Sequence, residues 1–229
     1  MQENKYIGDE KMAKMLEHYN CPTPLEIVKM RFAGAICSPN LELRPTDVIS
    51  SFWPQGQAPR LQTKDEADLF FKFFMGLWDE IFNQVQSNKI KLDKISAKNI
   101  AYYCERRYAE IELGYVEGFW GGKQDIKIPG FLAELIDNIS ELATVYNTLS
   151  KKFANGAGID EIMQAIQSCD KTVEKSISFI IENSVLPRAL ALSVNFIKCI
   201  WSTNIASSGE PVFSIHISST LYSVSRISV

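Results

Sequence analysis

Apolar residues recur every three to four positions through most of the first 206 residues, which is the spacing of one face of an α-helix. In the segment 9–19, for example, Met12, Met15 and Leu16 fall on one side. The segments that this pattern predicts as helices are 9–19, 23–37, 45–52, 65–85, 96–122, 129–153, 160–184 and 186–206. The sequence therefore predicts an all-α fold, a multi-helix orthogonal bundle, followed by a short β-like C-terminal tail.

The segment 65–85 carries apolar side chains around most of its circumference. A helix that is hydrophobic all round is normally buried, so we expect this one to be central, with Phe74 and Trp78 inside. Thr23 and Thr63 each precede a glutamate by three positions, which is the capping-box pattern of a helix N-terminus. Both threonines are therefore predicted to cap helices.

The segment 96–122 is predicted as one long helix that ends in a Gly-Gly pair. Ser96 is the expected N-cap residue, because its hydroxyl can accept a free backbone N–H of the first turn. Gly114 and Gly118 lie four positions apart and leave a bare patch where another helix can approach closely. The terminal glycines can adopt the positive φ that lets a helix end.

The chain is predicted to have three parts. We predict a helical core domain in residues 1–153, a helical extension in 154–206 and a Ser-rich tail in 207–229. The run Asn-Gly-Ala-Gly at 155–158 is the strongest linker signal. Apolar and polar residues alternate over 213–218, which is a strand period. Because an open strand edge recruits other chains, we expect the tail to be mobile or to pair with a partner, including a second copy in a homo-oligomer.

Overall charge and hydropathy narrow the function classes. Hydrophobic residues make up 46% of the 229 positions and charged residues 22%, as in ordinary soluble globular proteins. A net charge of -3 argues against a nucleic-acid binder with a broad basic surface. The first 16 residues lack the apolar core of a signal peptide, and charges interrupt the most apolar stretch, 177–206. We therefore expect a cytoplasmic protein that binds neither nucleic acid nor a membrane.

The residue types that commonly bind metals in proteins are scattered along the sequence. The five cysteines lie far apart in the sequence and the two histidines lie at opposite ends, so no local group provides the ligands of a zinc site. We expect no metal and no cofactor. Cys104 as a nucleophile would need a nearby base. Its position between Ile100 and Tyr108 on an apolar face favours a buried structural thiol instead.

A charged stripe on the segment 96–122 is the main candidate for chemistry. Its members are Glu105, Arg106, Arg107, Glu110, Glu112 and Glu117. Carboxylates at helical spacing can serve acid–base catalysis or hold a metal. The simpler interpretation is a solvated face on which Arg106 and Glu110 form an i,i+4 ion pair.

Aromatic residues at the ends of two predicted helices give a second candidate. Trp53 follows the segment 45–52, and Phe119 and Trp120 end the segment 96–122. Such residues fill a core or its rim more often than they form a ligand patch, and both interpretations stay open. The predicted interaction surface comprises Trp53, Glu105, Arg107, Glu112, Phe119 and Trp120.

Two blocks of the chain resemble the signatures of the YecA/YgfB-like bacterial proteins. The first block is 31–53, with Ala33-Gly34-Ala35, Pro39, Pro45 and Trp53; the second is 110–122, with Gly114, Tyr115, Gly118 and Phe119. The resemblance spans roughly residues 10–153 and implies an all-α fold without a defined activity. Some members carry a Cys-rich zinc-binding appendage, but 154–229 contains only two cysteines, so metal binding is not carried over.

These observations favour a non-enzymatic interaction or regulatory protein of the bacterial cytoplasm, acting on an unidentified protein partner. The alternative is a small-molecule-binding or hydrolytic enzyme that uses the helix face from Glu105 to Glu117. A concave pocket lined by Tyr103, Glu105, Arg107 and Glu112 would favour the enzyme, whereas a convex wet surface would count against it.

Overall fold

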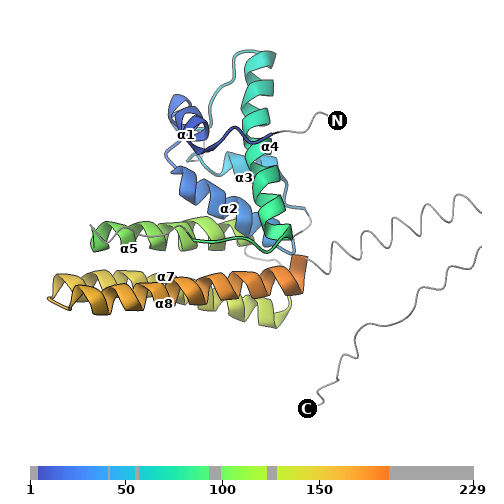
Figure 1. The fold of residues 1–229 in the computed structure, drawn as a ribbon. Coiled ribbons are helices and arrows are strands. Elements are labelled where there is room, and N and C mark those ends of the chain that lie inside the picture. Colours follow the sequence, from blue (N-terminus) through green and yellow to red (C-terminus); the bar gives the residue numbers. More distant parts are fainter. Residues whose placement is uncertain (1–4, 41, 55–56, 93–98, 123–127, 186–229) are drawn as a thin grey trace, which may run out of the picture. The chain divides into compact units, whose positions relative to one another are not determined.

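A computed structural model of the chain describes residues 5–40, 42–54, 57–92, 99–122 and 128–185 (Figure 1). These residues all lie in one compact unit, Met1–Ala189. Every regular element in these ranges is a helix, which confirms the predicted all-α bundle. The segments 186–206 and 207–229, expected to be a helix and a β-like tail, lie outside the described residues.

The helices follow the predicted segments closely. Their bounds are α1 Asp9–His18, α2 Leu25–Cys37, α3 Pro45–Ser50, α4 Lys64–Gln86, α5 Ile100–Ala109, the π-helix η1 Glu110–Val116, α6 Glu117–Trp120, α7 Gly130–Ala154, α8 Ile159–Ile180 and the π-helix η2 Ile181–Val185. The predicted helix 96–122 is therefore continuous from Ile100 to Trp120, but its middle is wound as a π-helix.

The central helix is α2, and the prediction that 65–85 is the most buried helix is wrong. Nine of the 13 residues of α2 are buried, against six of the 23 residues of α4. In α4, Leu69 and Phe71 are 49% and 40% exposed, so its apolar residues extend beyond the face that packs. Small residues explain the difference, because Ala33, Gly34 and Ala35 let neighbouring helices approach α2 from several sides.

An aromatic cluster joins α2 to α3 and α4. The Phe32 ring meets the rings of Phe52 and Trp78 edge-on, with centroids 5.3 and 5.1 Å apart. Phe74 is fully buried and stacks on Phe52 at 5.8 Å. The expectation for Phe74 is confirmed, whereas Trp78 lies only half-buried at the rim. Edge-on pairs at these separations add to the free energy of burial.

Three glycines let α2 lie directly against η1 and α6. A Cβ atom added to Gly34 would stand 2.0 Å from the Tyr115 carbonyl oxygen. One added to Gly118 would stand 2.2 Å from the Arg31 carbonyl oxygen, and one on Gly114 would meet the Met30 Cβ at 2.7 Å. The expected close approach at Gly114 and Gly118 is confirmed, and at Gly118 the atoms met belong to the Arg31 backbone.

Helices α5, α7 and α8 lie side by side, with α7 packed against both of the others (Figure 1). Helix α8 buries Ile166, Val173 and Ile177 through this packing. The described part of the predicted extension, 154–206, thus belongs to the same compact unit as residues 1–153. The predicted boundary at 206/207 lies outside the described residues and stays a prediction.

The predicted helix caps have mixed outcomes. Thr63 caps α4 by accepting the Glu66 backbone N–H at 3.1 Å, as expected. Thr23 does not cap α2, because its hydroxyl donates to the Phe52 carbonyl at 2.8 Å and ties α2 to the end of α3 instead. Helix α5 begins at Ile100 with Asn99 as its N-cap residue, so Ser96 lies upstream of the cap and outside the described residues.

Candidate functional site

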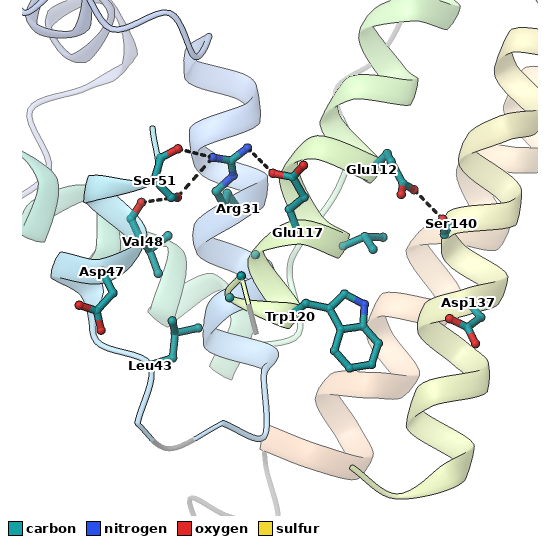
Figure 2. Close-up of a pocket in the computed structure, with 14 residues that line it drawn as sticks. Arg31, Leu43, Asp47, Val48, Ser51, Glu112, Glu117, Trp120, Asp137 and Ser140 are labelled. Atoms are coloured by element: carbon teal, nitrogen blue, oxygen red, sulfur yellow. Dashed lines mark hydrogen bonds and ion pairs between the residues drawn. The ribbon is translucent and has the colours of Figure 1, made fainter. Parts of the chain in front are cut away.

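A cavity of about 680 Å³ opens between α3, α6 and α7 (Figure 2). One wall is the α3 region, which contributes Asp47 and Ser51. The floor is the end of η1 and α6, where Trp120 lies half-buried, and the opposite wall is α7 with Asp137. A volume of this size falls within the range of small-molecule sites.

Arg31 lies at the back of the cavity, and its donors are taken up by the fold. Nη1 donates to the Ser51 carbonyl at 2.9 Å and to the Ser51 hydroxyl at 3.3 Å. Nε and Nη2 donate to the Leu113 carbonyl at 3.0 and 2.6 Å, and Nη2 also pairs with Glu117 at 2.8 Å. A guanidinium has five N–H groups, so these contacts occupy all of them.

The π-helix helps to explain why Arg31 can lie here. In an α-helix the Leu113 carbonyl would accept the N–H of Glu117, four residues on. In η1 the Glu117 N–H donates to the carbonyls of Glu112 and Gly114, and Leu113 accepts from Arg31. Burial lowers the pKa of the Arg31 guanidinium, and Glu117 offsets part of that change. π-Helical turns of this kind occur frequently at functional sites.

The α7 side of the cavity gathers two carboxylates and an indole. Glu112 accepts a hydrogen bond from the Ser140 hydroxyl at 2.7 Å, which fixes its position across the gap between η1 and α7. Asp137 is exposed one turn earlier on α7. The Trp120 ring extends from α6 toward this wall (Figure 2). We call Glu112, Asp137 and Trp120 the acidic corner.

A second polar cluster is buried between α5, α7 and α8. Arg107, 1% exposed, pairs with Glu110 at 2.5 Å and with Asp170 at 3.1 Å. Asp170 also accepts the Tyr146 hydroxyl at 2.6 Å and the Tyr103 hydroxyl at 3.1 Å. The cluster joins three helices, and each of its charges faces an opposite charge. We interpret it as structural, because buried ions need such partners to offset desolvation.

The pKa directions in this cluster follow from burial and charge. Burial lowers the pKa of the Arg107 guanidinium, but the carboxylates of Glu110 and Asp170 outweigh that effect and leave it above its ordinary value. Burial, followed by the hydrogen bond to Asp170, raises the pKa of the Tyr146 phenol. The phenol therefore stays neutral and the guanidinium charged at physiological pH.

The structure divides the predicted interaction surface. Glu112 and Trp120 line the cavity, and Glu105 lies exposed on α5 outside it. Trp53, Arg107 and Phe119 are 5%, 1% and 0% exposed, so the prediction that they form part of a surface is wrong.

The reasons for this burial differ from residue to residue. Trp53 is held in the core by its indole N–H, which donates to the Tyr19 carbonyl at 3.2 Å. Phe119 belongs to α6, which packs closely against α2, and its side chain is fully buried. Arg107 and Glu110 are buried in the cluster with Asp170, so the charged stripe is not a uniformly solvated face. Within it, the predicted pair Arg106–Glu110 is confirmed at 2.7 Å.

Sequence reasoning missed Arg31, Asp47, Asp137 and Ser140 as lining residues. Arg31 offered a usable signal, because it is a cation between Met30 and Phe32 in an apolar stretch of α2, and a charged residue in such a position needs buried partners. Asp137 and Asp47 look like ordinary surface acids in the sequence. The packing of α3 on α2 and of α7 on η1 brings them to one cavity.

Cys104 is fully buried, which confirms the structural interpretation, and burial raises the pKa of its thiol to about 11. A thiol with this pKa is a poor nucleophile at neutral pH. In the described ranges, no three His, Cys, Asp or Glu side chains are grouped so as to hold a metal ion. Likewise, none of the helices described above is long and apolar enough to cross a membrane.

No protein-family model, curated protein or solved structure matches this chain. Membership of the YecA/YgfB-like proteins stays a prediction.

Proposed function

We propose that this chain is a non-enzymatic cytoplasmic binding protein and that the cavity between α3, α6 and α7 is its binding site. The observation that carries the proposal is the cavity itself, about 680 Å³ in volume and lined by both charged and apolar side chains. Apolar walls with a few polar groups are typical of ligand sites. The cytoplasmic location rests on the sequence.

The rigidity of the surroundings supports this assignment. The floor of the cavity is fixed by the backbone contact of α2 with η1 and α6, at Gly34 and Gly118. Arg31 ties that floor to the α3 wall through Ser51, and Glu112 ties it to α7 through Ser140. A pre-formed site of this kind loses little conformational entropy when a ligand binds.

The test is a binding screen by ¹H–¹⁵N NMR on the full chain, with fragments grouped as cationic, neutral and anionic. The Trp120 indole N–H reports on the cavity, and Trp120→Phe assigns its signal. The Trp53 indole is the internal control, because it is buried and bonded to Tyr19. We expect at least one class to shift Trp120 and the nearby Gly121 amide without moving Trp53. If no class moves Trp120, the proposal is wrong.

One observation favours the alternative, a hydrolytic enzyme that uses Glu112. The Ser140 hydroxyl donates to the Glu112 carboxylate at 2.7 Å inside the cavity, and a serine beside a base is the start of a nucleophilic site. The only guanidinium in the described lining, that of Arg31, has its donors occupied, so it cannot stabilise an oxyanion. We therefore place binding ahead of hydrolysis.

Esterase assays separate the two functions. The binding proposal expects that p-nitrophenyl acetate is hydrolysed equally by the natural chain and by Ser140→Ala. A large drop in rate for Ser140→Ala, with Ser150→Ala as the control on the same helix, would establish the hydrolytic alternative instead.

A further inference from the structure

We infer that the ligand of this cavity carries an organic cation, an alkylammonium or alkylguanidinium group, and that the acidic corner holds it. The inference rests on the proposed function, because it names the class of ligand for the same site.

The lining of the cavity carries more negative than positive groups. The described lining includes four carboxylates, those of Asp47, Glu112, Glu117 and Asp137, but one guanidinium, that of Arg31. Arg31 pairs with Glu117 and spends its other donors on Ser51 and Leu113. An anionic ligand would therefore find no free guanidinium donor and would face the remaining carboxylates. A cationic ligand would instead be attracted by these carboxylates.

The acidic corner combines an aromatic ring with two carboxylates. The Trp120 indole extends from α6 toward α7 (Figure 2), and Asp137 and Glu112 line the same cavity. An indole face attracts ammonium and guanidinium groups, and does so more strongly than the other aromatic rings. The cavity thus offers an organic cation both an aromatic face and carboxylates, and each of them attracts a positive charge.

The lining of the cavity suits an organic cation better than a metal ion. In the described part of the chain no group of three His, Cys, Asp or Glu is arranged to hold a metal. The cavity also offers apolar surface from Leu43, Val48 and Val116, which suits methylene groups. A cationic head on an alkyl stem fits this combination. The cationic group can belong to a free amine or to a lysine or arginine side chain of a partner protein.

The experiment is a calorimetric titration of the full chain at low salt with 1,5-diaminopentane, and with 1,5-pentanediol as the neutral molecule of the same length. A second arm uses a peptide containing lysine and arginine, and the same peptide acetylated on lysine with citrulline for arginine. We expect a charged probe to bind at least about tenfold more tightly than its neutral match. Diamine binding would indicate a free amine, and peptide binding without diamine binding would indicate a protein side chain.

Matched variants locate the site. Asp137→Asn should weaken binding of the charged probe by about two- to fivefold, the effect of one partly exposed ion pair. Glu134→Gln removes a charge from the same helix outside the cavity and should leave binding unchanged. Both positions are exposed, so both variants should keep the fold, which circular dichroism checks.

Three results would overturn the inference, and they differ in which part of the proposal they leave intact. If neutral or anionic compounds shift the Trp120 indole but neither cationic probe binds, the ligand class is wrong and the proposed site survives. If none of the compounds shifts Trp120, both the ligand class and the proposed site are wrong. Equal binding to the natural chain and Asp137→Asn would also overturn the role of the acidic corner.

Discussion

Replacing Gly34 by alanine tests the feature on which the floor of the cavity depends. The added Cβ would stand 2.0 Å from the Tyr115 carbonyl oxygen and 2.8 Å from the Phe119 amide nitrogen. Real Cβ atoms essentially never come closer than 3.0 Å, so the helices must separate by about 1 Å. The atoms met belong to the backbone, and no side-chain rotation can relieve the clash.

Separation of α2 from η1 and α6 would loosen the packing of fully buried Phe32 and Phe119 on either side. We therefore expect Gly34→Ala to destabilise the fold by about 3 kcal/mol, at the upper end of the cost of overpacking. Urea unfolding followed by circular dichroism measures the change. Gly130→Ala is the control, because its Cβ would enter open space at the start of α7 and should change stability by less than about 1 kcal/mol.

The reasoning fails if Gly34→Ala and Gly130→Ala unfold at the same urea concentration. That result would mean that α2 does not contact η1 through its backbone, and the cavity floor would lose its support.

Three further predictions concern the core and the buried cluster. Phe74→Ala should lower the free energy of unfolding in urea by about 3–5 kcal/mol, and Leu69→Ala, at an exposed position, by less than about 1 kcal/mol. Equal losses in the two variants would place Phe74 outside the core. Asp170→Asn should lower the free energy of unfolding by about 2–3 kcal/mol. This is less than the usual loss of about 3–5 kcal/mol for a broken buried ion pair, because Glu110 still neutralises Arg107. An unchanged urea midpoint would contradict the ionic cluster. In the folded chain the raised pKa of Tyr146 keeps the phenol protonated, whereas in the unfolded chain the phenol loses its proton near pH 10. The contribution of Tyr146 to the free energy of unfolding is therefore fully present below about pH 10 and is lost as the pH rises further. Urea midpoints should fall between about pH 9 and pH 11, and fall less in Tyr146→Phe; a midpoint that rises with pH would refute the sign.

The sequence predicts the helices well because their signals are local. The apolar spacing of α7 and α8, the cap at Thr63 and the glycines at 114 and 118 each depend on residues within one or two turns. The same local view fails for burial in α4. The helix carries more apolar residues than its neighbouring helices cover. Phe71 is therefore exposed, although the sequence pattern predicts a buried helix.

The candidate site was only partly predictable, for a related reason. Glu112 and Trp120 are on the predicted charged and aromatic segment, and both line the cavity. Asp137 comes from a helix that starts after residue 128, and nothing in its own segment distinguishes it from a solvated acid. Arg107 looked exposed because its stripe is charged, but its partner Asp170 lies 63 positions away on α8. Contacts at such separations are set by packing.

The most direct measurement of the central claim is an isotope-filtered nuclear Overhauser experiment on the full chain saturated with 1,5-diaminopentane. The account predicts contacts from the methylene protons of the diamine to the Trp120 ring and to the Val116 methyl groups, both of which line the cavity. These contacts should weaken in Asp137→Asn. Contacts to residues outside the cavity, or none to Trp120 in a chain that binds the diamine, would contradict the account.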